Sequence, residues 1–261
     1  MNTSLELFRN RFAFKPQYAW YVGCEREAFV VNADDEIVPL SQYALSLLKD
    51  DAFGYELSAC QLESRVGPTL IDSMEQKVEE QQVMLQQKLS MNGLGVRYET
   101  VAPATMPLDV YPDPTGRYQQ IAAQLPQDVL LAACRVAGTH FHIGMPDMET
   151  ALHVYNDVIQ DLDTLVEAGN KTQGERMSIY QTMAPNFRPA PYTDSAHMHQ
   201  YYCEHGFVDD PRRCWHLIRI SAHGTIEFRM FDNTDDPAQV ALWGRMCYER
   251  CRNAHLKTVQ A

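Results

Sequence analysis

Residues 21–31, YVGCEREAFVV, carry two glutamates inside an apolar run that is typical of a buried strand. Side chains alternate between the two faces of a strand, so Glu25 and Glu27 share one face while Cys24 and Ala28 share the other. Two anions on one face repel each other, and burial would raise both pKa values unless a cation lies beside them. A bound divalent metal would resolve this conflict, whereas a solvated polar face would avoid it.

Length and charge limit what can surround this strand. The chain has 261 residues, of which 45% are hydrophobic, so it can bury the core of a large domain. We expect a single compact domain over residues 1–261. The 34 acidic residues outnumber the 22 basic ones, and a net charge of -12 argues against the broad positive surface that nucleic-acid binding needs. Cationic or metal-bound ligands suit this charge better.

The cysteines and the hydrophobic runs bear on the cellular compartment. The chain has seven cysteines, an odd number. CxxC spacing is absent from both close pairs, Cys203 with Cys214 and Cys247 with Cys251. The first residues contain no apolar core of signal-peptide length, and no run is long enough for a membrane span. The sequence therefore predicts a reduced, cytoplasmic protein that binds neither membrane nor nucleic acid.

Hydrophobic periodicity predicts the other elements. Strands are expected at 18–32, 136–145 and 223–232, the last of them in an antiparallel hairpin with LIRIS. Helices are expected at 40–51, at 69–93 with Leu70, Met74, Val78, Leu85 and Leu89 on one face, at 146–168 capped by Asp147, and at 236–256. The proline-rich segment 101–116 and the turn-rich, polar segment 170–214 are expected to be irregular.

Two further strands repeat the alternation of polar residues. GTHFHIGMP (138–146) puts His140 and His142 on one face, a pattern that suits a metal site and equally a hydrogen-bonded pair. GTIEFRMFD (224–232) puts Arg229 beside Glu227, which suits either a phosphate clamp or a salt bridge.

A third acidic segment is YELSACQLESRVGPT, in which Glu56 and Glu63 are seven residues apart. An unbroken strand would send these two side chains to opposite faces, because seven is odd. Their convergence therefore requires a bend, a bulge or a helix-like turn between them.

In their order along the chain, these motifs resemble those of the glutamate–cysteine ligase family, in particular its carboxylate–amine ligase branch within the glutamine synthetase-like superfamily. The family has a GxExE strand, an acidic segment, an RY pair after a proline-containing loop, a GxHxHxG strand and a TIExRxxD strand. The counterparts here are GCERE, residues 56–68, Arg117 with Tyr118, GTHFHIG and TIEFRMFD. The match spans roughly residues 20–240, and the common order of short motifs is what carries it.

The resemblance implies a set of site residues. Divalent cations, normally Mg²⁺ (or Mn²⁺), would be held by Glu25, Glu27, Glu56, Glu63, His140 and Glu227. ATP would be bound by Arg117, Tyr118 and Arg229, and the catalytic residues would be Glu227 and Arg229. A set rich in carboxylates is coherent with hard Mg²⁺, which prefers oxygen ligands and shares its coordination with nucleotide phosphates.

The resemblance also implies a fold and a reaction. The fold would be α+β, a glutamine synthetase-like catalytic domain whose curved, mainly antiparallel sheet carries the site on its concave face and helices on its outer face. The reaction would join a small carboxylate and an amine, such as an amino acid, in a γ-glutamyl-type amide bond. ATP would convert the carboxylate to an acyl phosphate, which the amine would then attack. Oligomerisation of identical chains is expected from the resemblance alone.

Departures from the family leave other interpretations open. The chain ends about 30 residues beyond the TIExR strand, which favours as an alternative a non-catalytic metal- or nucleotide-binding module that regulates or assists a partner. The segment 175–194 does not align with the family. Arg176 or Arg188 within it could bind a substrate carboxylate or phosphate, but each is interpreted as a surface arginine, the more common place for this residue type. A zinc hydrolase built on His140 and His142 is a third interpretation, disfavoured because so many carboxylates suit a harder metal.

Overall fold

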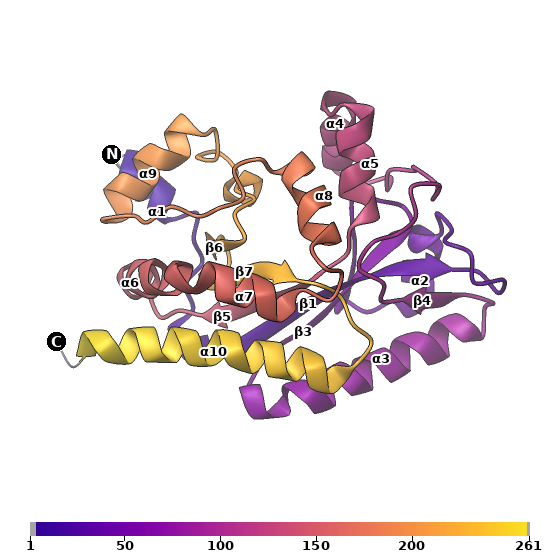
Figure 1. The fold of residues 1–261 in the computed structure, drawn as a ribbon, viewed down its shortest axis with the longest axis horizontal. Helices are drawn as coiled ribbons and strands as arrows, with labels where there is room; N and C mark the ends of the chain where they lie inside the picture. The colour runs from indigo at the N-terminus through magenta and orange to yellow at the C-terminus, as the bar shows by residue number, and fades with distance from the viewer. Residues whose placement is uncertain (1–3, 260–261) are drawn as a thin grey trace.

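The structure, a computed structural model that describes residues 4–259, has one antiparallel sheet with helices on both sides (Figure 1). The seven strands are in the order β2-β3-β1-β5-β7-β6, with β4 paired to the end of β1. Their bounds are β1 (Val22–Val31), β2 (Phe53–Tyr55), β3 (Gln61–Thr69), β4 (Gly95–Arg97), β5 (Thr139–Gly144), β6 (Ile218–Ser221) and β7 (Thr225–Phe231). The predicted antiparallel sheet and its terminal hairpin are confirmed.

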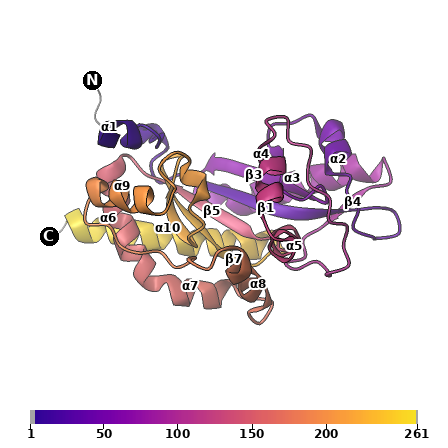
Figure 2. The ribbon, with the colours of Figure 1, turned by 90° about the horizontal axis from the view of Figure 1, so that it is seen from above.

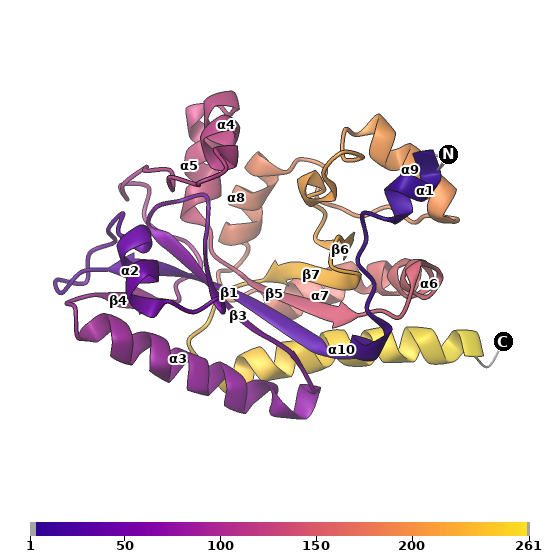
Figure 3. The same ribbon diagram turned by 180° about the vertical axis from the view of Figure 1, so that it is seen from behind.

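One face of the sheet is covered by four helices: α3 (Met74–Ser90), α6 (Met148–Val158), α7 (Leu162–Gly169) and α10 (Pro237–Val259). Figure 3 shows α3 and α10 running along this face. The strands contribute Cys24, Phe141 and Phe228 to the core, and α10 contributes Trp243, all of them fully or almost fully buried. The face opposite to the glutamates therefore holds the main core, as strand alternation predicts.

The remaining helices lie at the ends of the sheet or on its other face. Their bounds are α1 (Ser4–Arg9), α2 (Ser41–Leu48), α4 (Arg117–Gln124), α5 (Gln127–Arg135), α8 (Glu175–Met183) and α9 (Ser195–Glu204). Figure 2 shows α1 and α9 together at one end and α2 at the other, while Figure 1 shows α4, α5 and α8 standing above the sheet. Helices thus cover part of both faces, which corrects the expectation that they pack on the outer face alone.

Several predicted boundaries are wrong in detail. The segment 170–214 contains α8 and α9, although it was expected to be irregular. Leu70 lies before the helix and is 57% exposed, because a 3-10 turn at Ile71–Ser73 precedes α3. The helix expected at 146–168 is interrupted by a 3-10 turn at Ile159–Asp161, but Asp147 caps it as predicted, accepting from the Thr150 N–H at 2.8 Å.

Other predictions are confirmed by the backbone. The segment 101–116 forms no helix or strand, and the helices expected at 40–51 and 236–256 are present as α2 and α10. No helix among residues 4–259 has the length and the hydropathy needed to cross a membrane.

A buried arginine ties the central strand to the segment that follows β7. Arg26 lies on the core face of β1 and is only 1% exposed. Its guanidinium stacks 4.0 Å from the ring centre of Tyr98 and donates to the carbonyl oxygen of Thr234 at 2.6 Å and to Oε1 of Gln82 at 3.1 Å. These contacts offset part of the cost of burying the charge, although Nε has no hydrogen-bond partner among the described residues, and they join β1 to the segment that precedes α10.

His216, just before β6, makes the fold sensitive to acid. The ring is 1% exposed, and its Nε2 lies 3.2 Å from the Tyr201 hydroxyl. Burial, with smaller contributions from His205 and Arg219, lowers the pKa of His216 from 6.5 to about 4. The unfolded chain therefore takes up a proton at this residue at a higher pH than the folded protein does, and stability present above pH 6.5 is lost as the pH falls.

We predict that His216→Gln, which keeps a hydrogen-bonding group but does not titrate, reduces the loss in free energy of unfolding as the pH falls. The native protein should lose about 2 kcal/mol more than the variant between about pH 7 and about pH 4.5. Urea unfolding at both pH values measures this difference. Equal losses in the two proteins would show that His216 is not the titrating group.

Candidate active site

Strand register assembles the polar face of the sheet. On β1, Glu27 is paired with Glu63 of β3, while Glu25 is paired with Arg65 of β3 on one side and His140 of β5 on the other. Because paired residues of antiparallel strands project from the same face, these side chains gather above the centre of the sheet.

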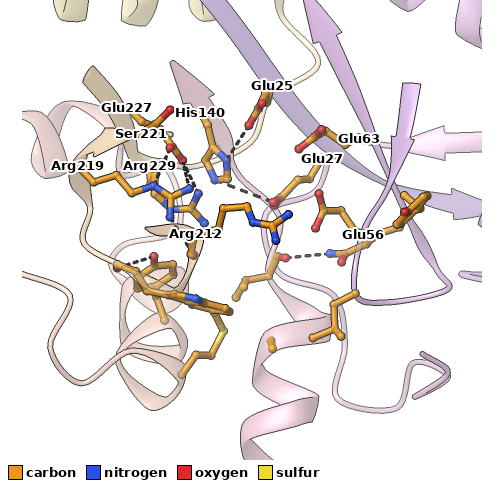
Figure 4. A pocket seen from close by; sticks show the side chains of 18 of the residues that line it. Glu25, Glu27, Glu56, Glu63, His140, Arg212, Arg219, Ser221, Glu227 and Arg229 are labelled. Atoms are coloured by element: carbon orange, nitrogen blue, oxygen red, sulfur yellow. Dashed lines mark hydrogen bonds and ion pairs between the residues drawn. The ribbon is translucent and has the colours of Figure 1, made fainter. Parts of the chain in front are cut away.

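The same row continues toward the far edge. His142 of β5 is paired with Glu227 of β7, and Glu227 is paired with Arg219 of β6. The row borders a cavity of about 450 Å³ (Figure 4). Every residue predicted for the site lines this cavity, namely Glu25, Glu27, Glu56, Glu63, Arg117, Tyr118, His140, Glu227 and Arg229.

Glu56 reaches Glu63 through a reversal of the chain. Residues 56–60 connect β2 to β3, which pair as a hairpin with Gly54 opposite Glu63. Glu56 therefore lies in the connection and Glu63 on β3, and the interruption of the strand that their odd spacing requires is a reversal of the chain.

The first wall of the cavity, which we call the acidic wall, consists of Glu25, Glu27, Glu56 and Glu63. Burial, and then the charges of Glu63 and Glu27, raises the pKa of Glu56 well above its ordinary value. Burial and the charge of Glu25 raise the pKa of Glu63 to about 7, although Arg65 lies 2.6 Å from its carboxylate. These carboxylates are short of positive charge, which is the condition that a bound cation would relieve.

Two histidines border the acidic wall. Nε2 of His142 lies 3.3 Å from Oε2 of Glu25, and His140 stands between Glu25 at 3.8 Å and Glu27 at 4.0 Å. Burial alone would raise the pKa of Glu25, but His142 and His140 hold it well below its ordinary value. The other oxygen of Glu27 accepts from the backbone N–H of Gly138 at 2.7 Å. That backbone contact orients the Glu27 carboxylate.

Glu227 is enclosed by two arginines. It is 1% exposed; Oε2 accepts from Nε of Arg219 at 2.7 Å and Oε1 from Nη2 at 2.9 Å, while Arg229 donates to Oε1 as well. Burial alone would raise the pKa of Glu227, but Arg219 and Arg229 keep it below its usual range. Oε1 thus accepts two hydrogen bonds and Oε2 one, so the lone pair that remains on Oε2 is the part of Glu227 left for a metal ion.

The cavity is also lined by Arg117, Arg176, Arg212, Arg219 and Arg229, which we call the basic wall, and Figure 4 shows Arg212, Arg219 and Arg229 across from the glutamates. Arg176 is 2% exposed, so its interpretation as a surface residue is wrong. Its Nη2 donates to the Arg229 carbonyl oxygen at 3.1 Å, while Nε and Nη1 have no hydrogen-bond partner within the described part of the chain. Arg188 is exposed and pairs with Asp163 at 2.7 Å, as expected of a surface residue.

Asp232, the last residue of TIEFRMFD, holds the helix that carries Arg176. Its Oδ2 accepts from the backbone N–H groups of Lys171 and Thr172 at 2.7 and 2.8 Å, and from the Thr172 hydroxyl at 2.8 Å. The same hydroxyl accepts from the N–H of Arg176 at 3.3 Å. The end of β7 thereby fixes the start of α8.

A second aspartate holds the start of α4. Oδ2 of Asp113 accepts from the N–H groups of Arg117 and Tyr118 at 3.1 and 3.3 Å. The Tyr55 hydroxyl donates to Oδ1 of Asp113 at 3.2 Å. These bonds satisfy amides that have no partner inside the helix, and they place the predicted Arg117–Tyr118 pair at the cavity.

The cavity lining includes Arg212, Arg219 and Trp215, which sequence reasoning did not assign to the site, and Arg176, which it considered as an anion ligand but placed at the surface. The position of Arg219 could have been predicted from the sequence. The AHG turn pairs Ser221 with Thr225, and this register places Arg219 opposite Glu227. No comparable signal exists for Arg176 or Trp215, whose positions depend on how α8 and the segment before β6 pack.

The carboxylates of the acidic wall are chemically suited to a hard cation, but their side chains are not already arranged around a metal position. No group of three His, Cys, Asp or Glu side chains within residues 4–259 is already arranged around a metal position. Four carboxylates on one wall, two of them with raised pKa values, nevertheless match the oxygen preference of Mg²⁺. Their side chains would have to converge on the ion.

Comparison with known proteins finds similarity to glutamate–cysteine ligases. The chain is 25% identical over 244 residues to a glutamate–cysteine ligase of Natronomonas pharaonis, covering 84% of this chain and 66% of that protein. It is 24% identical over 229 residues to a putative glutamate–cysteine ligase 2-3 of Rhodococcus jostii, covering 81% and 29%. The resemblance to glutamate–cysteine ligases is confirmed, and the chain spans less than two thirds of the length of either relative.

Solved structures add a likeness in fold. A bifunctional glutathione synthetase from Pasteurella multocida superposes with a TM-score of 0.59 at 11% identity, covering 97% of this chain and 42% of that one. No protein-family model matches the sequence. The architecture, mixed helices with an antiparallel sheet, is therefore shared with a ligase of known structure.

We predict that Gly138→Ala disturbs both walls. A Cβ at this position would collide with the Arg176 guanidinium and approach the Phe231 carbonyl oxygen to 3.1 Å. The expected loss of stability is about 1–3 kcal/mol, and it should be smaller when Arg176 is already replaced by Met. A double-mutant cycle by chemical denaturation measures the coupling. An equal loss in both backgrounds would mean that Gly138 does not make room for Arg176.

We predict that Glu56→Gln has opposite effects with and without divalent cation. Removing one repelling carboxylate should stabilise the metal-free protein by about 1 kcal/mol. The same change should reduce the stabilisation that excess Mg²⁺ provides, because one ligand is lost. Thermal unfolding in chelator and in Mg²⁺ tests this, with Glu175→Gln at an exposed position as the control. A variant destabilised in chelator, with an unchanged Mg²⁺ effect, would contradict the assignment of the acidic wall.

Proposed function

We propose that the chain is an ATP- and Mg²⁺-dependent ligase that joins a carboxylate to an amine through an acyl phosphate, forming a γ-glutamyl-type amide. The observation that carries the proposal is the facing of the acidic and basic walls across one cavity of about 450 Å³. A metal-complexed polyphosphate carries both charges, with its cation suited to one wall and its anion to the other. The similarity to glutamate–cysteine ligases supports the same reaction class.

Each wall has a distinct part in this reaction. Glu25, Glu27, Glu56 and Glu63, with His140, would hold the metal, which when bound neutralises phosphate charge. Arg229 and Arg219, fixed by Glu227, present guanidinium groups where charge develops on the transferring phosphoryl group. Because these arginines are already oriented, little reorganisation is needed as the charge forms.

Arg176 supplies the anchor for the substrate anion. Its Nε and Nη1 are buried without a partner among the described residues, and it lines the cavity. Buried guanidinium donors left unpaired are costly, and a substrate carboxylate or phosphate oxygen would satisfy them. Arg117 and Tyr118, held at the start of α4, would contact the nucleotide.

The rest of the proposal concerns the setting of the site. We take residues 1–261 as one glutamine synthetase-like catalytic domain with the site on its concave face; residues 1–3 and 260–261 lie outside the described part. All seven cysteines are free thiols, which supports a reducing, cytoplasmic environment. Self-association of the chain is proposed from the resemblance, and sedimentation would test it.

Turnover separates the ligase from the alternative, a non-catalytic module that binds metal or nucleotide. The ion pairs of Glu227 with two arginines, which reduce its capacity to bind a metal, favour that alternative. Incubation with ATP, Mg²⁺ and a panel of carboxylates and amines should release ADP only when both substrates are present, with an amide detected by mass spectrometry. Nucleotide binding without any carboxylate-dependent ADP release would establish the module instead.

We predict that two substitutions separate binding from chemistry. Glu25→Gln removes a charge from the acidic wall and should weaken MgATP binding by about tenfold as well as slow turnover. Arg229→Ala removes a guanidinium that acts on developing charge, so the rate should fall by about 100-fold or more with less effect on MgATP affinity. Calorimetry and ADP release measure the two effects. Equal losses of binding and rate in Arg229→Ala would make it a ground-state anchor.

A further inference from the structure

Arg65 differs from the arginines of the basic wall, because it lies among the glutamates. It is paired with Glu25 across β1 and β3, and its Nε donates to Oε1 of Glu63 at 2.6 Å. Within residues 4–259, it is the only lysine or arginine that forms an ion pair with the acidic wall. Without metal, the wall therefore holds a guanidinium of the protein itself as a cation.

The β2–β3 hairpin leaves room for this guanidinium. Gly54 of β2 lies opposite Glu63, and a Cβ added at Gly54 would collide with Nη2 and Cζ of Arg65. The backbone of Gly54 is not in the left-handed region, so the space for the guanidinium, and not the backbone conformation, favours glycine at this position. A larger residue would push the guanidinium away from its place beside Glu63.

Apart from this one ion pair, Arg65 is held loosely. The only other hydrogen bond of its side chain among the described residues joins Nη1 to the Asp51 carbonyl oxygen at 3.4 Å, and the side chain is 46% exposed. By contrast, Arg219 is 12% exposed and donates to two backbone carbonyl oxygens as well as to Glu227. Arg65 also lines a neighbouring cavity of about 580 Å³ that none of the basic-wall arginines borders, so the guanidinium has space in which to move away from Glu63.

We propose that Arg65 is a counter-ion that a divalent cation displaces from Glu63, so that the acidic wall exchanges its own guanidinium for the metal. This inference rests on the proposed function and deepens it, by assigning a residue that sets how tightly the site holds Mg²⁺. The guanidinium occupies Oε1 of Glu63, an oxygen that a metal ion would otherwise coordinate, and its charge repels a second cation nearby. The metal-free wall is stabilised as a result, and its affinity for Mg²⁺ is lowered.

Calorimetric titration of Mg²⁺ into the full chain, without nucleotide, measures this effect. Arg65→Met removes the charge and keeps most of the length of the side chain, so Mg²⁺ affinity should rise by about fivefold or more. Arg65→Lys restores a cation and should restore most of the native affinity. The titration is made at about pH 8.5, because the pKa of Glu63 is raised to about 7 and the loss of Arg65 would raise it further, so that a proton could take the place of the guanidinium.

Gly54→Ala moves the guanidinium without removing its charge. The added methyl group takes the place of Nη2, so Mg²⁺ affinity should rise as it does in Arg65→Met. Arg245→Met is the matched control, because Arg245 is 45% exposed, pairs with Asp72 at 2.7 Å and does not line the cavity. It should leave Mg²⁺ affinity unchanged. Thermal unfolding in chelator checks that each variant is folded, and Arg65→Met should unfold at a lower temperature than Arg245→Met.

NMR of protein labelled with ¹⁵N at arginine observes the displacement directly. The Nε–H of Arg65, assigned by its loss in Arg65→Lys, is hydrogen-bonded in the metal-free structure and should exchange faster with water when Mg²⁺ is bound. The Nε–H of Arg219, bound to Glu227, is the internal reference. An unchanged exchange rate for Arg65 in saturating Mg²⁺ would show that the guanidinium stays on Glu63, and would overturn the proposal.

The outcomes separate this inference from the ligase. Weaker or unchanged Mg²⁺ binding in Arg65→Met makes Arg65 a support for Glu63 and overturns the displacement. Absence of Mg²⁺ binding in the native chain and in the variants overturns it as well. If the affinities follow the expected order while no pair of carboxylate and amine releases ADP, the ligase fails and the counter-ion role stands. If ADP is released but Arg65→Met needs more Mg²⁺ than the native chain, the ligase stands and this inference fails.

Discussion

Glu27 and Glu63 face each other directly across two hydrogen-bonded strands, and the site depends on this unfavourable pairing. Like charges opposite one another in a sheet destabilise it, and here burial adds to the cost. The structure compensates only in part, through Arg65 beside Glu63 and the Gly138 N–H on Glu27. The fold tolerates the pairing because the opposite face of the same strands holds the main apolar core, which supplies the stability that the polar face lacks.

The arrangement of charge follows from topology rather than from any single loop. Strands β1 and β3 carry three glutamates of the acidic wall, and the connection before β3 carries Glu56, while β6 and β7 carry two of the basic residues at the other side of the sheet. The central strand β5 contributes His140 and His142 between them. Loops and helices are then fastened to this frame by buried carboxylates, Asp232 at the start of α8 and Asp113 at the start of α4. Neutral hydrogen-bonding groups would hold those helix ends less strongly.

Local patterns and tertiary packing contribute differently to what the sequence predicts. The two-residue period of GCERE suffices to place Glu25 and Glu27 on one face, because strand alternation is a local property. The partner of Glu27 is not local, since it depends on a hairpin and on the register of β1 with β3. The burial of Arg176 is not predicted because it lies on the buried side of α8, where a helical pattern needs apolar residues. The segment 170–214 is therefore interpreted as polar and irregular.

Glu227 also limits how far the two charged walls of the cavity can neutralise each other. With four carboxylates on one wall and several guanidinium groups on the other, the simplest response would be for the walls to neutralise each other and close the space between them. Glu227 prevents this for Arg219 and Arg229 by holding both at the base of the sheet with its own buried charge. Opposite charges thus stay apart without a ligand. A cation bound at the acidic wall should therefore raise the affinity of the basic wall for an anion. By reciprocity, an anion bound at the basic wall should raise the affinity of the acidic wall for a cation by the same factor.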